Sequence, residues 1–183
     1  MNLEREVKLR FSSVDEARAA VLSTGAVPLL GRRLQEDSLF DTPDDQLHGK
    51  RSALRLRREN GSSRITFKGP VQADEMKLRE ELETIIGDGD VVRRVFEELG
   101  LRVWFRCEKY REEFSHQDVI VAIDETPVGV FVEIEGTEPG ISEMTRLLGR
   151  TPADYILNSY YSLFQQHRNQ TGSTDRDMVF TAE

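Results

Sequence analysis

Charged side chains of both signs occupy every second position in five short segments, with apolar side chains between them. Successive side chains of a β-strand point to opposite faces, so each segment would form one charged face and one apolar face. Carboxylates bind hard divalent cations, and Arg and Lys bind phosphate. A strand face that supplies both kinds of group is suited to a metal–polyphosphate complex. The five segments are residues 4–11, 54–57, 65–68, 79–83 and 132–135.

Three pairs of glutamates lie two positions apart. On a strand the two carboxylates of a pair project from the same side, ~6.6–6.8 Å apart along the chain. Carboxylates held this close need cations, and Mg²⁺ and Mn²⁺ both prefer oxygen ligands. A single pair is typical of a solvated edge strand, but three pairs in one short chain favour a metal site. The pairs are Glu4 with Glu6, Glu81 with Glu83, and Glu133 with Glu135.

A set of cations follows the same strand spacing and complements the carboxylates. Guanidinium groups match phosphate oxygens in bidentate geometry, so the set is suited to a triphosphate. Packed together inside a protein, these cations would repel one another strongly without an anion. The alternative is that each cation pairs with a neighbouring carboxylate in an empty lumen. The set comprises Lys8, Arg55, Arg57, Lys68, Arg79, Lys109 and Arg111.

Composition restricts the classes of function. The net charge of −8 argues against broad nucleic-acid binding but allows a local basic cavity. No apolar run approaches the ~18 residues of a membrane span, and the N-terminus is not a signal peptide. Cys107 is the only cysteine, so no internal disulfide forms, which fits a cytoplasmic protein. We expect Cys107 in the core, and surface positions for His48, His116 and His167.

The element pattern predicts an α+β domain over residues 1–165 and a flexible tail over residues 166–183. Eight strands with short helices between them favour a closed antiparallel β-barrel. Its polarity would be inverted, with a charged lumen and with the apolar strand faces packed against helices outside. A half-exposed sheet with the charges in water is the commoner arrangement and remains the alternative. The predicted strands are 3–11, 34–41, 53–58, 63–68, 76–85, 104–114, 119–124 and 130–135, and the predicted helices are 14–23, 91–99, 142–148 and 151–165.

Taken in order, the charged segments resemble the CYTH superfamily, also called triphosphate tunnel metalloenzymes, over about residues 2–164. The Glu-x-Glu-x-Lys motif formed by Glu4, Glu6 and Lys8 is similar to the signature near the N-terminus of that family. The stretch 108–135 is most similar to the class IV adenylyl cyclase subgroup. Further matches are 35–41, 53–57, 66–70, Arg79-x-Glu81-x-Glu83, Lys109-x-Arg111, Asp124, 129–135, and Ser159-Tyr160 with Leu163.

The resemblance implies a tunnel that holds a triphosphate with one or two divalent ions, Mg²⁺ or Mn²⁺. The seven cations would bind the phosphates, with Lys8, Lys68 and Lys109 as the candidate catalytic residues. Glu81 and Glu83 would ligate metal or orient those cations. A homodimer is expected from the resemblance alone. The implied metal ligands are Glu4, Glu6, Asp124, Glu133 and Glu135.

One position departs from the family pattern. Leu39 stands where many relatives have Tyr, so a mechanism that uses that hydroxyl is not available here. Three aromatic residues are candidates for stacking on a nucleobase, although core packing is the expected main role. These are Trp104, Phe105 and Tyr110.

Two reactions use the same binding apparatus. A hydrolase directs water at the terminal phosphorus, whereas a cyclase directs a ribose hydroxyl at the α-phosphorus and must keep water away. The sequence favours a metal-dependent triphosphate hydrolase acting on inorganic or thiamine triphosphate. A class IV adenylyl cyclase acting on ATP is the first alternative, and a sensor that binds triphosphate or polyphosphate without turnover is the second.

Overall fold

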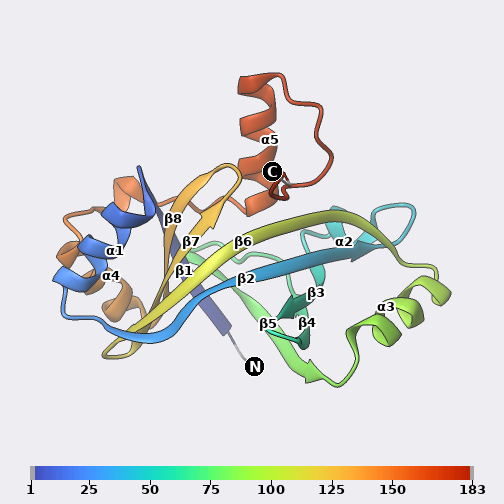
Figure 1. Cartoon of the computed structure of the whole chain (residues 1–183), viewed down its shortest axis with the longest axis horizontal. Helices are drawn as coiled ribbons and strands as arrows, with labels where there is room; N and C mark the ends of the chain where they lie inside the picture. Colours follow the sequence, from blue (N-terminus) through green and yellow to red (C-terminus); the bar gives the residue numbers. More distant parts are fainter. Residues whose placement is uncertain (1–2, 182–183) are drawn as a thin grey trace.

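The computed structural model describes residues 3–181, in which eight antiparallel strands close into a barrel in the order β1-β5-β4-β3-β2-β6-β7-β8 (Figure 1). This confirms the predicted α+β barrel with helices outside. The strands are β1 (Leu3–Phe11), β2 (Val27–Asp41), β3 (Ala53–Glu59), β4 (Ser62–Lys68), β5 (Lys77–Ile86), β6 (Arg102–His116), β7 (Val119–Thr126) and β8 (Gly129–Gly136). The helices are α1 (Val14–Ser23), α2 (Gln46–Gly49), α3 (Gly89–Glu98), α4 (Glu138–Leu147), the 3₁₀ turn η1 (Pro152–Asp154) and α5 (Tyr160–Thr171).

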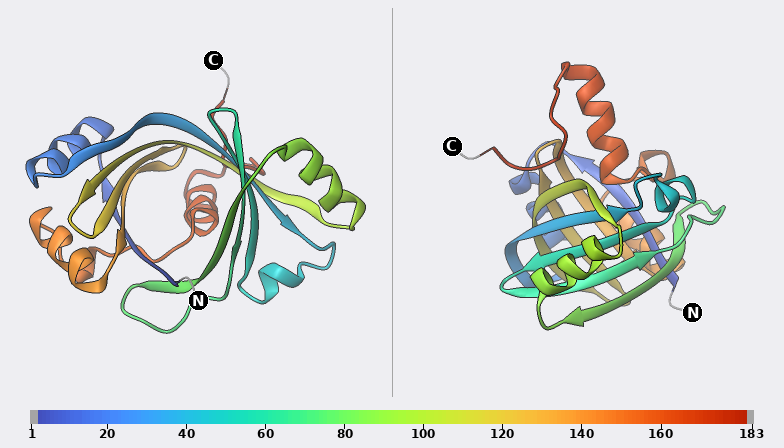
Figure 2. Two further views of the ribbon diagram at one scale, coloured as in Figure 1. Left: turned by 90° about the horizontal axis from the view of Figure 1, so that it is seen from below. Right: turned by 90° about the vertical axis from the view of Figure 1, so that its right-hand side faces the viewer.

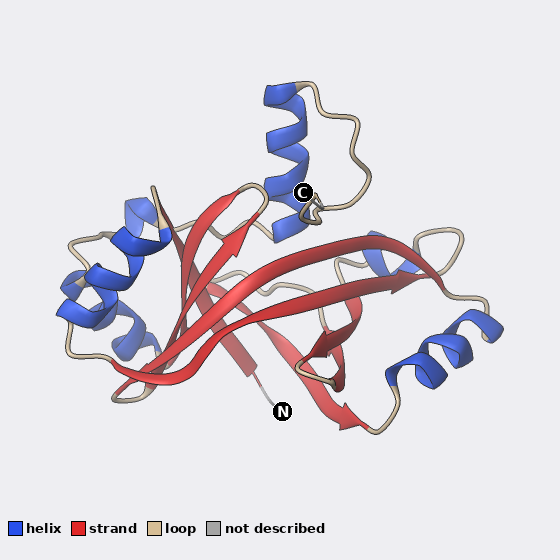
Figure 3. Ribbon diagram, in the orientation of Figure 1, coloured by secondary structure: helices blue, strands red, loops and turns tan. Residues whose placement is uncertain are grey.

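The apolar strand faces form the core outside the lumen, as the alternating pattern predicts. One buried cluster packs β1, β7 and β8 against α1 and α4, and it includes Val7, Leu9 and Ile134. A second buried cluster packs β6 and β8 against α5, and it includes Phe105, Phe131 and Phe164. Figure 2 shows α1 and α4 side by side against one wall of the barrel, and Figure 3 shows that the helices lie outside the strands. Burial of this apolar surface leaves the charged faces to line the interior.

Strand β2 is longer than the sequence predicts and begins at Val27 rather than Leu34. Pro28 and Gly31 argue against a regular strand in this stretch. The structure accommodates them with register shifts against β6 between Pro28 and Leu30 and between Leu30 and Arg33. Bulges of this kind let a strand continue through residues that cannot hold the regular ladder.

Turn chemistry fixes the β3–β4 hairpin. Asn60 and Gly61 both have positive φ, at 48° and 74°, between the paired residues Glu59 and Ser62. This is the Asn-Gly turn whose twist matches that of the flanking strands. Strand β4 therefore begins at Ser62, one residue before its predicted start at residue 63.

The predicted helix over residues 151–165 is wrong. A capping box between Thr151 and Asp154 closes only the single turn η1. The chain then runs extended, and the amide of Ile156 donates to the carbonyl of Lys8 at 2.9 Å. Ser159 caps the true helix, α5, by accepting from the amide of Ser162. This tertiary pairing to β1 overrides the local helix signal.

The chain beyond α5 also differs from the predicted tail. Helix α5 continues to Thr171, and Met178 is fully buried in the second core cluster. The amide of Met178 donates to Arg106 and its carbonyl accepts from Glu108, which adds this segment to the edge of β6. Because most residues after 166 are polar, the sequence did not indicate that Met178 is buried. Residues 1–2 and 182–183, the ends of the predicted domain and tail, lie outside the described residues.

Helix α2 is an element that the sequence did not predict. The buried carboxylate of Asp41, at the end of β2, accepts backbone hydrogen bonds from Thr42, Leu47 and His48 at 2.7–2.8 Å. Burial alone would raise the pKa of Asp41, but these hydrogen bonds outweigh burial and hold the pKa below its usual value. They also fix α2 beside the end of the barrel near Leu39. Within the described chain, no helix is long and apolar enough to cross a membrane.

Candidate active site

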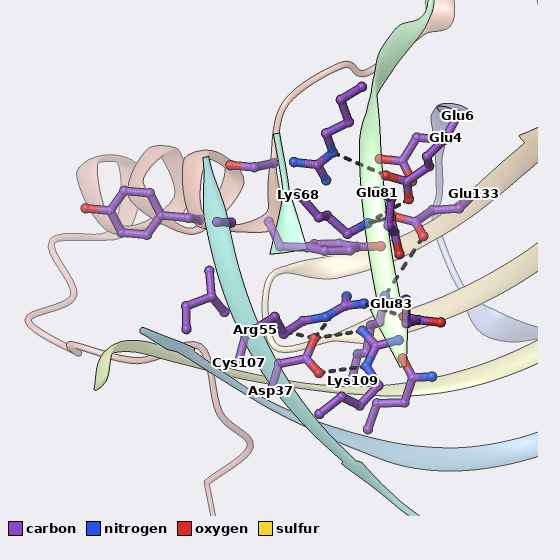
Figure 4. A pocket seen from close by; sticks show the side chains of 18 of the residues that line it. Glu4, Glu6, Asp37, Arg55, Lys68, Glu81, Glu83, Cys107, Lys109 and Glu133 are labelled. Atoms are coloured by element: carbon purple, nitrogen blue, oxygen red, sulfur yellow. Dashed lines mark hydrogen bonds and ion pairs between the residues drawn. The ribbon is translucent and has the colours of Figure 1, made fainter. Parts of the chain in front are cut away.

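A cavity of about 980 Å³ runs through the barrel and is lined by the charged strand faces. Figure 4 shows the two groups of side chains that face each other across it. The carboxylates of Glu4, Glu6 and Glu133 gather in the upper part of the view, and Asp37, Arg55 and Lys109 lie in the lower part. The first turn of α5 lines one end of this cavity, which we call the α5 end. The structure therefore brings the predicted cations and carboxylates into one interior space.

Asp37 on β2 organises the cations of β3. Its carboxylate receives two bonds from the Arg57 guanidinium, each at 2.7 Å, and lies 3.7 Å from Arg55. Burial alone would raise the pKa of Asp37, but Arg57 and Arg55 outweigh burial and hold it well below its usual range. The sequence analysis quoted Asp37 within a motif and gave it no role. The structure places Asp37 as the anion that orients two candidate phosphate ligands.

Arg55 is the least satisfied cation of this group. Its Nη2 donates to Thr66 at 3.0 Å, and its distance to Glu83 is 3.6 Å. Its buried Nε has no hydrogen-bond partner among the described residues. Burial and the neighbouring Arg57 lower the pKa of Arg55, so the charged guanidinium is under-compensated. A buried donor without a partner costs free energy, which an anion in the lumen would recover.

Asp124 on β7 orients the cations of β6 in the same way. The carboxylate is fully buried and accepts from Lys109 and Arg111, with closest contacts of 2.6 Å each. The hydroxyl of Tyr160 on α5 also donates to it at 2.6 Å. The resemblance implies a metal ligand at Asp124, whereas these contacts place it among the cations.

Five other carboxylates form an acidic corner, made by Glu4, Glu6, Glu81, Glu133 and Glu135. Lys68 lies 2.7 Å from Glu4 and 2.6 Å from Glu81. Lys8 lies between Glu6 and Glu133, at 3.2 and 3.0 Å. Because of these two carboxylates, the pKa of Lys8 is raised despite its burial. The corner thus consists of carboxylates held together by ammonium groups.

The pKa of Glu135 bears on whether this corner fits a divalent cation. The residue is exposed at the rim of the cavity, yet partial desolvation and then the carboxylates of Glu4 and Glu6 raise its pKa to about 7. The carboxylates of Glu4 and Glu6 thus affect Glu135 more strongly than the nearby Lys68 does. Among the described residues, no three His, Cys, Asp or Glu side chains are already arranged as a metal site. The oxygen-rich donor set fits Mg²⁺ or Mn²⁺ once Lys68 and Lys8 release their carboxylates.

Some lumen residues were missed by the sequence analysis. Lys77 on β5 pairs with Glu6, and burial lowers its pKa to about 8. Its position two residues before Arg79 was the signal that identifies it. Arg33 pairs with Glu59 at 2.8 Å and Glu113 at 2.9 Å, away from the acidic corner. Arg33 was missed because the predicted strand began at residue 34, although Arg33 lies in regular register with Gln35 and Asp37.

The aromatic candidates divide between the cavity and the exterior. Trp104 and Phe105 line the α5 end of the cavity, in contact with Tyr161. Tyr110 instead lies outside it, where it packs on Arg32 and Phe180. Cys107 is buried and lines the cavity, and desolvation followed by Asp37 raises the pKa of its thiol to about 12. A protonated thiol of this kind is not a nucleophile.

A family model for the CYTH domain matches residues 2–151. The chain belongs to the CYTH domain family. The match covers every strand of the barrel and ends before α5, so the helix at the α5 end lies outside it. Membership accounts for the paired glutamates and alternating cations together.

Similar proteins from other organisms support this assignment. A Methanocaldococcus jannaschii protein named "Putative adenylate cyclase" is 29% identical over 147 residues, which is 80% of this chain and 83% of that protein. A solved structure of a "putative adenylate cyclase" from Vibrio parahaemolyticus has a TM-score of 0.78 at 21% identity, covering 90% of this chain and 98% of that one. A Hippeastrum protein has a TM-score of 0.64 at 22% identity and is described as a "putative adenylyl cyclase" with dominant triphosphatase activity; 90% of this chain and 96% of that one are covered. At 21% and 22% identity the two structures establish the fold alone.

Asp37→Asn should destabilise the protein because it leaves Arg55 and Arg57 buried without their anion. We expect a loss of about 3–5 kcal/mol in the free energy of unfolding near neutral pH. The pKa of Asp37 is lower in the folded state than its ordinary value of 3.8. Its stabilisation is therefore complete well above that value and is lost as the pH falls. Urea unfolding between about pH 5 and about pH 2 should show the wild type and variant converging.

The control is Asp15→Asn, whose side chain is 97% exposed and lies 3.8 Å from Arg18. This change should leave the unfolding curve unaltered, because exposed pairs contribute ~0–1 kcal/mol. A difference between wild type and Asp37→Asn that stayed constant across the acid range would contradict the proposed role of the Asp37 charge.

Proposed function

We propose that this protein binds a triphosphate and a divalent metal, Mg²⁺ or Mn²⁺, inside the barrel and hydrolyses a phosphoanhydride bond. The observation that carries the proposal is the Nε of Arg55 without a partner among the described residues, across the lumen from the acidic corner where Glu135 lies near the carboxylates of Glu4 and Glu6. A polyphosphate would satisfy the first and a metal cation the second. A metal–triphosphate complex carries both groups in one ligand, and a cavity of about 980 Å³ has room for it.

The residues then have distinct roles. Arg55 and Arg57, oriented by Asp37, and Lys109 and Arg111, oriented by Asp124, would bind phosphate oxygens from two walls of the lumen. Arg79 and Lys68 pair with Glu4 in this structure, and both would turn to the phosphates when the corner receives its metal. Positioning of this kind supplies most of the catalysis in phosphoryl transfer, because charge spreads over the phosphoryl oxygens.

The acidic corner would hold the metal through Glu4, Glu6, Glu133 and Glu135, with Glu81 beside them. A divalent ion there neutralises developing charge on the phosphoryl oxygens and can lower the pKa of a bound water. Lys8 lies between Glu6 and Glu133, so its ammonium group adjoins both the metal ligands and the phosphates. Lys8, Lys68 and Lys109 are therefore the candidates for contact with the reacting phosphoryl group.

Hydrolysis is favoured because the cavity reaches solvent at the rim where Glu135 lies. A cyclase must instead exclude water from the α-phosphorus. Two observations favour the cyclase as the second candidate. Trp104 and Phe105 offer aromatic surface at the α5 end for a base, and the M. jannaschii relative is named for that activity. Fold likeness does not choose between these reactions.

Product analysis tests the proposal directly. Inorganic triphosphate, thiamine triphosphate and ATP would each be incubated with the purified protein and Mg²⁺ or Mn²⁺, and phosphate, pyrophosphate and cyclic AMP quantified. Orthophosphate without cyclic AMP is the expected result. Equal amounts of cyclic AMP and pyrophosphate would replace the hydrolase with the cyclase. Binding of all three without turnover would identify a sensor.

Glu4→Gln combined with Glu6→Gln should abolish metal-dependent turnover. The amides keep the shape of the side chains but remove the two charges that the metal requires. We expect circular dichroism to show the same fold with a lower unfolding midpoint, because Lys68 and Lys77 each lose a buried carboxylate partner. Glu36→Gln, on the exposed outer face of β2, is the control and should retain wild-type turnover. Full activity in the double variant would refute the metal assignment.

Arg55→Ala should raise the KM for inorganic triphosphate by about tenfold or more, because charged hydrogen bonds contribute ~1.5–3 kcal/mol. Steady-state kinetics at saturating metal would measure it. Arg58→Ala is the matched control from the same strand, since Arg58 faces outward and pairs with Asp90. If both variants kept the wild-type KM, Arg55 would not contact the substrate.

A further inference from the structure

Tyr160 brings a phenol into the cavity from α5, outside the strands that carry the other lumen side chains. Two features of the chain fix its place. The amide of Ile156 is bonded to the carbonyl of Lys8 on β1, and Ser159 caps the helix that Tyr160 begins. The hydroxyl then reaches the fully buried Asp124 on β7 at 2.6 Å.

The ring of Tyr160 also contacts the lysines of the site. The Nζ of Lys109 lies 4.7 Å from the ring centroid, and that of Lys8 lies 5.2 Å from it. Phe131 packs against the ring edge-on, with centroids 5.7 Å apart. Desolvated cation–π contacts stabilise an ammonium group in place. One side chain of α5 thus contacts charged residues on β1, β6 and β7.

One carboxylate oxygen of Asp124 has three donors around it, one more than its two lone pairs. Lys109, Arg111 and Tyr160 all donate to Oδ2, each at 2.6 Å. A carboxylate oxygen has two lone pairs, so one donor can leave without leaving the oxygen unsatisfied. When Lys109 turns to a phosphate oxygen, the neutral Tyr160 hydroxyl can remain and keep Asp124 oriented toward Arg111. A substrate would then gain a cation without leaving a buried carboxylate poorly solvated.

Leu39 supplies no hydroxyl at this end of the cavity. It lines the cavity and packs against the same cluster as Tyr160, but its side chain has no polar atom. The hydroxyl at this end of the cavity is therefore supplied by a helix that lies beyond the residues matched by the family model.

We propose that Tyr160 is a positioning residue, which holds Asp124 in place and so makes Lys109 and Arg111 available to a triphosphate. The proposal rests on the proposed function only for its ligand, since it requires triphosphate binding and not turnover. It assigns to α5 a part in ligand binding beyond its packing against the barrel.

Tyr160→Phe tests this role because it removes the hydroxyl and keeps the ring. Binding of inorganic triphosphate, measured by calorimetry without divalent metal, should weaken by about tenfold, the effect of one hydrogen bond to a charged group. If the protein has turnover, KM should rise by a similar factor while kcat changes little. The thermal unfolding midpoint should stay close to that of the wild type. Unaltered binding, or a loss of folding, would overturn the proposal.

Tyr161→Phe is the matched control, from the next position of the same helix turn. Its ring packs on Trp104, Phe105 and His48, and its hydroxyl has no hydrogen bond among the described residues. This variant should bind inorganic triphosphate as the wild type does. An equal loss of affinity in Tyr161→Phe would mean that α5 packing, and not the Tyr160 hydroxyl, is responsible.

A double-variant cycle tests whether Tyr160 acts through Asp124. In an Asp124→Asn background, Tyr160→Phe should have little further effect on triphosphate affinity, because the carboxylate that it holds is gone. Fully additive effects would overturn the positioning role. These binding measurements remain decisive if all three candidate substrates prove inert, so failure of the hydrolase proposal is distinguishable from failure of this one.

Discussion

The burial of many charges of both signs in one lumen is the constraint on which this structure depends. A buried charge without a partner is costly, so each cation needs an anion and each carboxylate a donor. Asp37 and Asp124 meet this need for the cations, and Lys8 and Lys68 meet it for the carboxylates. Strand register decides which groups meet, and the closed barrel keeps that register because each described strand pairs with two neighbours. The apolar strand faces and outer helices stabilise the shell around this interior.

Arg55 and Glu135 are compensated incompletely, in opposite senses. The Nε of Arg55 has no partner among the described residues, and partial desolvation followed by the carboxylates of Glu4 and Glu6 raises the pKa of Glu135 to about 7. Structural stability alone would favour full neutralisation of both positions. A ligand with phosphate at one end and a metal ion at the other would instead satisfy both, because the phosphate would accept from Arg55 and the metal would lie near Glu135. Local charge imbalance in the cavity, rather than the net charge of −8, therefore supports the proposed ligand.

Helix α5 connects this charged interior to the apolar exterior. Leu163 and Phe164 pack in the second core cluster, while Tyr160 on the same helix reaches Asp124 in the lumen. Stability of the outer packing and geometry of the inner network are thus coupled through one element. The segment around Met178 strengthens this coupling, because it pairs with β6 behind Cys107 and Glu108.

Alternation at a period of two places Glu4, Glu6 and Lys8 on one side of a strand whatever the surroundings, so the strand faces, the barrel, its inverted polarity and its charge-lined lumen could be predicted from local pattern. The same motifs indicated the CYTH family. Which charges pair depends instead on tertiary contacts, through which Asp124 joins the cations and Tyr160 enters the lumen. The start of α5 and the burial of Met178 were likewise set by pairing with β1 and β6. These depend on contacts between residues far apart in the chain, such as Lys8 with Ile156, which no local pattern encodes.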